Sequence, residues 1–296
     1  MNTEALRTVA ATYGTPTYIF DVREVEARIR LLRSLLPEDT GLCFAVKANP
    51  FLIPYVADLV DRLEVCSPGE YEICIQEQIA PEKIVVSGVN KTYESMKRIL
   101  SYSKGAGIYT IESEEHAKIL RTLAEKNQMP LSVLIRLSSG NQFGVDAETF
   151  LRLAKEIQES PYLTLAGVHY YAGTQKRQSK LEKELDTLTA FAKTFEEETG
   201  TVLNELEYGA GMKVSYFIND SEKDQRESEP EPQIQALAEK LRTCAYGKKT
   251  IELGRFLVSM SGYYLTRVMD VKRTAQPGFL ILDGGIHQIN YYGWMM

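Results

Sequence analysis

The sequence lacks the excess of basic residues that nucleic-acid-binding proteins carry. Its 296 residues include 34 Lys and Arg against 40 Asp and Glu, and the formal net charge is −6. A nucleic-acid partner is therefore not expected. Long hydrophobic runs are also missing, because no segment approaches the roughly 20 apolar residues that a membrane-spanning helix needs. A membrane partner is not expected either.

Histidine and cysteine are scarce, and their spacing excludes the common metal motifs. The sequence has three histidines and four cysteines, namely His116, His169, His287, Cys43, Cys66, Cys74 and Cys244. They form neither a CxxC pair nor a metal triad, so no metal site is predicted. We expect the cysteines to be buried free thiols. The N-terminal segment lacks the charged-then-apolar order of a secretory signal, so a cytoplasmic location is expected.

What the chain does contain is a repeating order of short apolar run, polar turn and amphipathic helix, which is typical of βα units with a parallel sheet. Eight strands are predicted at 42–46, 62–65, 83–87, 107–111, 132–137, 165–170, 205–208 and 250–252. Helices are predicted between them at 53–59, 69–78, 93–102, 113–126, 147–160, 180–199 and 233–244. Ser67 and Ser113 precede two of these helices as expected N-caps.

Eight such units in about 215 residues predict a (β/α)8 barrel over residues 22–256, with the active site at the carboxyl ends of the strands. A doubly wound sheet is the alternative. Further strands predicted at 17–20, 263–272 and 279–282 indicate a second, β-rich domain made of residues 1–21 and 257–296. Residues 219–232 (NDSEKDQRESEPEP) are predicted to form a solvated surface loop.

Three polar segments follow predicted strands and could meet at one rim of the barrel. Lys47 ends the first strand, and an amine in a partly desolvated pocket has a lowered pKa and can form a Schiff base. The glycine-containing turn 208–211 (YGAG) lets backbone amides approach a phosphate, and Arg255 could bind the same phosphate from the end of strand eight. The alternatives are a solvent-reaching lysine and a structural ion pair between Glu252 and Arg255.

Other polar residues at strand ends have less specific interpretations. Glu64, Arg136 and Tyr171 belong to this set, whereas His169 alone is more often a core histidine with satisfied hydrogen bonds. Glu70 could belong to the site or simply to the capped start of the second helix.

Eight segments in order resemble the fold-type III, or alanine-racemase-like, PLP-dependent decarboxylases, the family of diaminopimelate, ornithine and arginine decarboxylases. They are GTPTYIFD (14–21), FAVKANP around Lys47, EVCSPGE (64–70), IRLSSGNQFGVD (135–146), GVHYYAGTQ (167–175), LEYGAG (206–211), IELGRF (251–256) and LDGG (282–285). The pairing of His-x-Tyr with Gly-Thr-Gln is similar to the branch that contains a butirosin-pathway decarboxylase acting on a carrier-protein-bound glutamyl group.

The resemblance implies pyridoxal 5'-phosphate (PLP) as cofactor, bound by Lys47 as a Schiff base, with Glu252 beside the pyridine nitrogen. A carboxylate there keeps the ring protonated and favours decarboxylation, whereas racemases of this fold have an arginine. Tyr171 stands where many members have a histidine stacked on the cofactor, and His169 joins it among the implied catalytic residues. The remaining implied cofactor contacts are Glu64, Glu70, Arg136, Thr174, Gly209, Ala210, Gly211 and Arg255.

The implied activity is decarboxylation of an L-amino acid, free or carrier-bound, by a homodimer. Members of the family usually continue for about another hundred residues, enough for a full second domain. We therefore expect that domain to be C-terminally truncated here. A PLP-binding protein without turnover is the alternative, because the absent part normally completes the active site.

Overall fold

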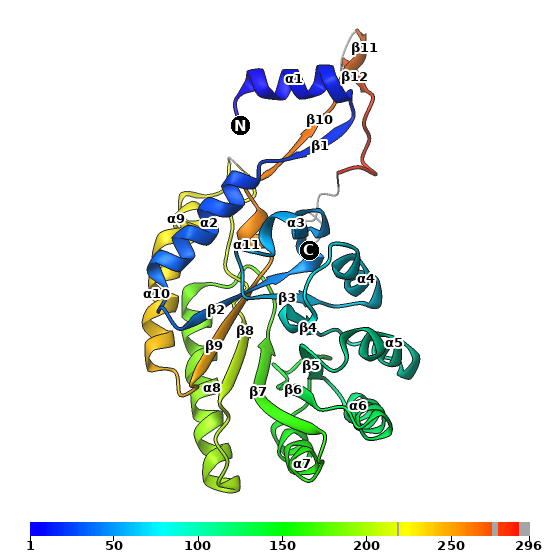
Figure 1. Cartoon of the computed structure of the whole chain (residues 1–296). Coiled ribbons are helices and arrows are strands. Elements are labelled where there is room, and N and C mark those ends of the chain that lie inside the picture. The colour runs from blue at the N-terminus through cyan, green and yellow to red at the C-terminus, as the bar shows by residue number, and fades with distance from the viewer. Residues whose placement is uncertain (218, 274–277, 290–296) are drawn as a thin grey trace.

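A computed structural model describes residues 1–217, 219–273 and 278–289. Eight parallel strands form a closed barrel in chain order, each paired with the next and the last with the first (Figure 1). These strands are β2 Thr40–Ala45, β3 Arg62–Val65, β4 Ile84–Val86, β5 Ile108–Ile111, β6 Leu131–Arg136, β7 Leu163–Tyr171, β8 Glu205–Gly209 and β9 Lys248–Leu253. The predicted barrel is confirmed, and the doubly wound alternative is wrong, because β2 pairs with β9 and leaves the sheet without an edge.

Helices cover the outside of the barrel and bury their apolar faces against the strands. They are α3 Ile53–Val56, α4 Pro68–Gln76, α5 Tyr93–Ser103, α6 Glu114–Asn127, α7 Ala147–Gln158, α8 Gln178–Thr199, α10 Pro230–Thr243 and α11 Arg255–Val258. The predicted N-caps are confirmed, since the Ser67 hydroxyl accepts from the Glu70 amide and the Ser113 hydroxyl from the His116 amide.

One barrel helix was missed from the sequence. Helix α2 (Val22–Leu35) precedes β2 and packs against α10 and α11, so it covers the place where the barrel closes. Val25, Ile29 and Leu32 form its buried stripe at helical spacing, and Asp21 caps its first turn. Because α2 precedes the first barrel strand, it lies outside the order of strand followed by helix from which the other helices were predicted.

The predicted loop at 219–232 needs a second correction. Helix α9 (Glu222–Glu227) lies within it, and Pro230 starts α10. Ser221 caps α9 through a hydrogen bond from the Asp224 amide, and Asp224 and Glu227 both bind Lys213. Local capping and ion pairs therefore order a segment whose composition indicated only a solvated loop.

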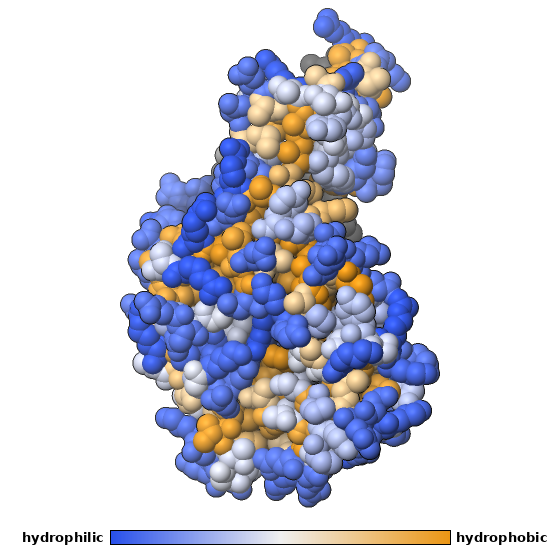
Figure 2. Space-filling model, in the orientation of Figure 1, coloured by the Kyte–Doolittle hydropathy of each residue, from blue (hydrophilic) through white to orange (hydrophobic). Residues whose placement is uncertain are grey.

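Additional strands lie beyond the barrel, in the segments where a β-rich second domain was predicted. Strand β1 (Thr17–Phe20) pairs with β10 (Gly262–Leu265), and β11 (Val268–Lys272) pairs with β12 (Phe279–Leu282). The single strand predicted at 263–272 is thus two strands in different sheets. Helix α1 (Thr3–Tyr13) and both small sheets project from one end of the barrel (Figure 1), and apolar side chains on β11 and β12 are exposed there (Figure 2). The exact domain boundaries stay a prediction.

All four cysteines are free, but only two of them, Cys43 and Cys74, are buried; Cys66 and Cys244 are half-buried. Among the described residues, no helix combines the length and apolar character that crossing a bilayer takes. The cytoplasmic location stays a prediction.

The interior of the barrel contains a small apolar cluster and a cluster of ionic groups. Cys43, Val85, Ile108 and Leu134 form a separate apolar cluster inside it. Arg62 on β3 and the two glutamates Glu205 and Glu207 on β8 are also buried, and Arg62 pairs with both glutamates. Because side chains alternate along a strand, the same inward faces of β3, β7 and β9 carry polar residues up to the carboxyl rim.

Candidate active site

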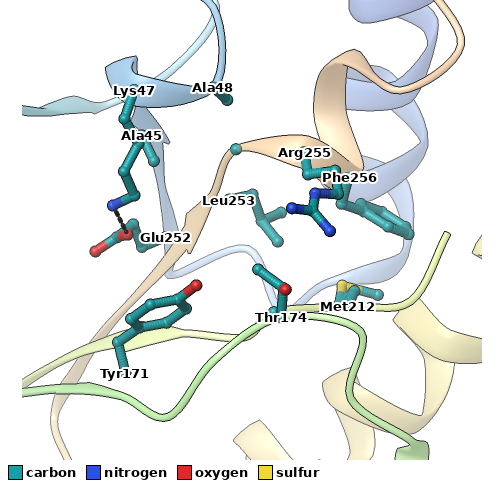
Figure 3. Close-up of a pocket in the computed structure, with 12 residues that line it drawn as sticks. Ala45, Lys47, Ala48, Tyr171, Thr174, Met212, Glu252, Leu253, Arg255 and Phe256 are labelled. Atoms are coloured by element: carbon teal, nitrogen blue, oxygen red, sulfur yellow. Dashed lines mark hydrogen bonds and ion pairs between the residues drawn. The ribbon is translucent and has the colours of Figure 1, made fainter. Parts of the chain in front are cut away.

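Lys47 lies at the carboxyl rim, in a 3₁₀ turn (Val46–Ala48) that directly follows β2. Its Nζ donates to Glu64 Oε2 at 2.8 Å and lies 3.3 Å from Glu252 Oε1. Figure 3 shows the lysine pointing down from this turn to Glu252 on β9. The side chain is 41% exposed, yet its charged end is fixed by two carboxylates rather than free in solvent.

The expected lowering of the Lys47 pKa is wrong for this cofactor-free arrangement. Burial does act to lower the pKa, but the Glu252 and Glu64 carboxylates together outweigh it, and the pKa of Lys47 is raised above its ordinary value. Opposite charges within hydrogen-bond distance favour the charged amine. The sequence indicated the burial of the lysine without revealing that two carboxylates share its nitrogen.

Glu252 is the central anion of the site. It lies on the inward face of β9, is 5% exposed, and its Oε2 lies 3.2 Å from His169 Nε2. Burial alone acts to raise the pKa of this carboxyl group, but Lys47 and His169 outweigh it and lower the pKa to about 2. Glu252 is therefore ionised across the ordinary pH range, and its partners are Lys47 and His169 rather than Arg255.

A cavity of about 300 Å³ opens beside Lys47, between the ends of β2, β8 and β9. Figure 3 shows Thr174, Met212 and Arg255 across this space from Lys47 and Glu252. Arg255 Nη1 is buried and has no hydrogen-bond partner among the described residues. A buried guanidinium nitrogen without a partner is costly, and an anion in the cavity would satisfy it.

A second cavity, of about 270 Å³, shares Lys47, Tyr171 and Glu252 with the first. Glu64, Arg136 and His169 also line it. The Tyr171 ring centroid lies 5.6 Å from Lys47 Nζ and 5.9 Å from Arg136 Cζ. The ring thus borders both cavities, beside the amine that the sequence singled out.

The glycine turn supports the site at two different places. A Cβ on Gly209 would lie 2.5 Å from the Tyr171 ring, so this glycine makes room for the tyrosine, and Ala210 is wholly buried. Gly211 lines the first cavity with φ +58°, and a Cβ there would lie 2.1 Å from the Gly173 carbonyl oxygen. Only Gly211 of the three lines the cavity where the anion would sit.

Glu70 and Arg136 lie farther from the amine. Glu70 Oε2 accepts a hydrogen bond from the Cys66 amide at 2.7 Å, which ties the start of α4 to the end of β3. Arg136 Nη1 donates to the buried Glu112 at 2.7 Å, and its Cζ lies 4.9 Å from the Phe143 ring centroid.

Three site residues were missed from the sequence: Cys66, Ser87 and Glu207. Cys66 Sγ lies 3.5 Å from Lys47 Nζ, and Ser87 donates to Glu64. Burial and the nearby Glu64 raise the pKa of Cys66 to about 12, so the thiol stays protonated. Their position at or just after strand ends was the signal available for Cys66 and Ser87, and the alternating pattern of β8 was the signal for Glu207.

The donor set fits PLP. A phosphate group fits Arg255 Nη1 and the crowded glycine turn at Gly211, and an aldehyde fits a lysine amine in the same cavity. The buried Glu252 carboxylate fits a protonated ring nitrogen. The fold and this set of residues define a PLP-binding (β/α)8 barrel.

Comparison with known sequences identifies the family within this class of PLP-binding barrels. The profile of the family described as "Pyridoxal-dependent decarboxylase, pyridoxal binding domain" matches residues 22–259, and the chain belongs to this family, whose cofactor is PLP. A diaminopimelate decarboxylase from Actinosynnema pretiosum subsp. auranticum is 31% identical, over 94% of this chain and 66% of the relative. An L-glutamyl-[BtrI acyl-carrier protein] decarboxylase from Niallia circulans is 25% identical, over 97% and 71%.

Solved structures agree on the fold. The crystal structure of AQ1208 from Aquifex aeolicus superposes with a TM-score of 0.82 at 25% identity, covering 95% of this chain and 68% of the other. Diaminopimelate decarboxylase from M. jannaschii, in complex with L-lysine, gives 0.82 at 21% identity, covering 94% and 70%. The chain therefore spans about two thirds of the length of the relatives that it matches.

Proposed function

We propose that this chain catalyses the PLP-dependent decarboxylation of an L-amino acid or amino-acyl substrate, with Lys47 as the amine that binds the cofactor. The observation that carries the proposal is the position of Lys47 Nζ, bound to Glu64 and Glu252 in a cavity that Arg255 also lines, whose Nη1 has no hydrogen-bond partner within residues 1–217, 219–273 and 278–289. When bound, PLP supplies an electron sink for the electron pair that CO2 leaves on the α-carbon.

The polar residues of the site have separate tasks in this proposal. Lys47 holds the cofactor through its aldehyde, and Glu252 holds a proton on the ring nitrogen, which strengthens the electron sink. His169 Nε2 lies against Glu252 Oε2 and orients that carboxylate. An arginine in place of Glu252 would disfavour a ring proton, so the carboxylate favours a decarboxylase over a racemase.

The other proposed contacts anchor and orient the cofactor. Arg255, Thr174 and Gly211 line one cavity and would bind the phosphate, with Gly209 and Ala210 shaping the turn from behind. Tyr171 offers an aromatic face beside Lys47 in place of the histidine of many relatives. Arg136 lies on the other side of that ring, and Glu64 and Glu70 secure the lysine side.

The comparisons support two substrate classes. The relatives include decarboxylases named for the amino acid diaminopimelate and a decarboxylase named for a glutamyl group on an acyl-carrier protein. Both classes present a carboxylate on a carbon that bears an amine. The homodimer that the family resemblance implies belongs to this proposal, and light scattering of the purified chain tests it.

The decisive experiment is spectroscopic. Purified protein loaded with PLP is expected to show a visible absorption band that borohydride bleaches, because the lysine–cofactor linkage is reducible. Lys47→Ala should abolish the band, whereas Lys118→Ala, an exposed lysine on α6, should keep it. A missing band in the unaltered protein, or a band that survives in Lys47→Ala, would refute the cofactor role of Lys47.

Turnover is tested next, by measuring CO2 release from a panel of L-amino acids and carrier-bound amino-acyl groups. Release from at least one of them is expected. A normal band without release from any substrate would instead support a PLP-binding protein without turnover.

A further inference from the structure

In and below the proposed cofactor site, Lys47 and Arg62 each bind two buried carboxyl groups. Lys47 binds Glu64 and Glu252 at the rim, and Arg62 binds Glu205 and Glu207 one layer deeper. All four glutamates are at most 6% exposed. Buried carboxylates that lack a full counter-charge take up protons. The glutamate with the weakest compensation by its neighbours is therefore the one expected to take up a proton.

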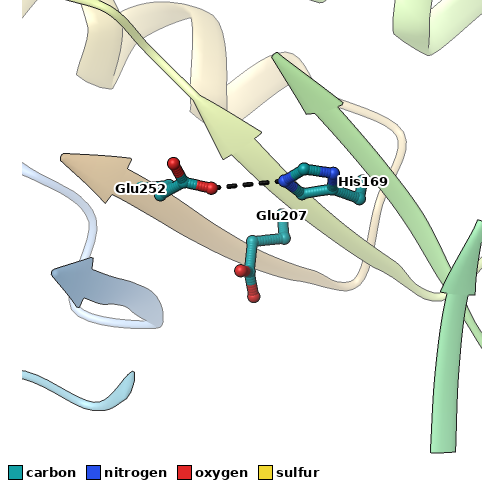
Figure 4. Close-up of side chains that lie close together, drawn as sticks. All are labelled: His169, Glu207 and Glu252. Carbon is teal, nitrogen blue, oxygen red and sulfur yellow. Dashed lines mark hydrogen bonds and ion pairs between the residues drawn. The ribbon is translucent and has the colours of Figure 1, made fainter. Parts of the chain in front are cut away.

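Glu207 has the fewest contacts of the four. It is wholly buried on β8, its Oε2 accepts from Arg62 Nη1 at 2.9 Å, and its Oε1 has no hydrogen-bond partner in the part of the chain that the structure describes. One oxygen or nitrogen atom from each of Glu207, His169 and Glu252 lies within 4.8 Å of the others. Figure 4 shows Glu207 beneath the His169–Glu252 pair, on the strand between theirs.

The negative charges of the other three carboxyl groups are better compensated by neighbouring cations and hydrogen-bond donors. Glu252 has Lys47 and His169, Glu64 has Lys47 and the Ser87 hydroxyl, and Glu205 has Arg62 and, at 3.3 Å, the half-exposed Lys248. The remaining group close to Glu207 is the buried thiol of Cys43 on β2, which is uncharged because burial raises its pKa.

The electrostatics agree with this geometry. Burial raises the pKa of Glu207 to about 7, and the negative charge of Glu252 adds to that rise, although Arg62 and His169 oppose it. The pKa of Glu252 shifts the other way. Two neighbouring carboxyl groups whose environments separate their pKa values can hold one proton and one charge between them.

We propose that Glu207 is a positioning residue that holds a proton up to about neutral pH, so that below that pH the neighbouring Glu252 is the single anion facing the cofactor ring. This inference rests on the proposed function, because it assigns Glu252 to the ring nitrogen. With Glu207 protonated, no second negative charge stands beside the His169–Glu252 pair.

The proposal predicts a pH profile that a merely structural residue would not produce. As Glu207 loses its proton near pH 7, a second negative charge appears beside Glu252, and the absorption of the loaded protein should change with an inflection near that pH. Glu207→Gln imitates the protonated form and should remove this inflection. Glu205→Gln is the matched control, because Glu205 binds the same arginine but is not part of the His169–Glu252 group.

A second readout needs no cofactor and therefore separates failure of this inference from failure of the proposed function. A carboxyl group with a raised pKa destabilises the folded state once the pH exceeds its unfolded pKa, and the cost grows until the folded pKa is passed. Glu207→Gln should therefore gain melting temperature relative to the unaltered protein between pH 5 and pH 8.5, by roughly 2–4 °C for each 1 kcal/mol. Glu205→Gln should not show this gain.

The outcomes are distinct. A melting-temperature difference that does not change with pH would contradict the proposal that Glu207 carries a proton. An inflection near pH 7 that survives in Glu207→Gln, or that disappears equally in Glu205→Gln, would also contradict it. If the cofactor band is absent from the unaltered protein while the pH-dependent stability difference is present, the protonated Glu207 stands and the proposed function fails.

Discussion

At the rim of the barrel, neighbouring charged groups determine the protonation state of a single residue, Lys47. Lys47 alone in a buried place would lose its charge readily, but the Glu64 and Glu252 carboxylates keep the amine protonated until a cofactor arrives. The cofactor aldehyde reacts only with the neutral amine. Loading is therefore expected to be coupled to loss of a proton from Lys47.

The role of Glu252 can be tested at the same scale. Glu252→Gln keeps the size of the side chain and removes the charge that holds a proton on the ring nitrogen. We expect the variant to retain the visible PLP band and to lose decarboxylation by about 10²-fold or more, as when one preorganised electrostatic group is removed. Glu115→Gln, an exposed residue on α6, is the control. Unchanged turnover in Glu252→Gln would contradict the assigned role.

At the scale of elements, the alternation of side chains along each strand selects the residues of the site. His169 and Tyr171 on β7 lie two residues apart and both face inward, while Tyr170 between them packs outward against Tyr208. The parallel pairing of β7 with β8 sets Tyr171 opposite Gly209, where the missing Cβ leaves space for the ring. Strand register therefore decides that Tyr171 borders both cavities.

The turn after β8 allows the effect of steric crowding by an added Cβ to be separated from the effect of backbone strain at positive φ. Gly211 and Gly200 both have positive φ, but a Cβ meets nothing within 4 Å at Gly200 and lies 2.1 Å from the Gly173 carbonyl at Gly211. Gly200→Ala should cost about 1–2 kcal/mol of unfolding free energy and leave PLP affinity unchanged. Gly211→Ala should cost more and also weaken PLP binding. Denaturant titration and titration of the visible band measure the two effects, and equal affinities in the two variants would contradict the proposed phosphate turn.

At the scale of the whole molecule, closure of the barrel assembles the site. Lys47 and Glu252 are separated by 205 positions in the chain, and they meet because β2 and β9 pair as the first and last strands of the barrel. A ligand that bridges these ends binds only the folded protein. Binding should therefore stabilise the whole barrel.

Addition of PLP at a hundredfold excess over its Kd is expected to stabilise the protein by about 2.7 kcal/mol, measured as a rise in melting temperature. Pyridoxine 5'-phosphate, which has the phosphate but no aldehyde, should stabilise it less, and Lys47→Ala should remove the difference between the two compounds. An identical rise with both compounds in the unaltered protein would show that Lys47 forms no covalent link.

Much of this architecture follows from local sequence. Each barrel strand was predicted because a buried parallel strand appears in the sequence as a short apolar run between polar turns. Lys47, Glu252 and Arg255 were found because they lie at or just after the ends of such runs. Helix α2 was missed although its apolar stripe was present, and α9 was missed because ion pairs to Lys213 order it. Interactions of this last kind join residues whose proximity local sequence does not encode.

The sequence by itself determined the barrel, the family and the residues at the strand ends, because periodicity and motifs are local properties of the chain. Only the tertiary structure decided the charge states. The carboxylates around Lys47, the burial of Arg255 Nη1 beside the cavity and the position of Glu207 beneath Glu252 all arise from contacts across the closed barrel. Electrostatic energies depend on the distances between charges and on their burial, and the order of residues in the chain specifies neither directly.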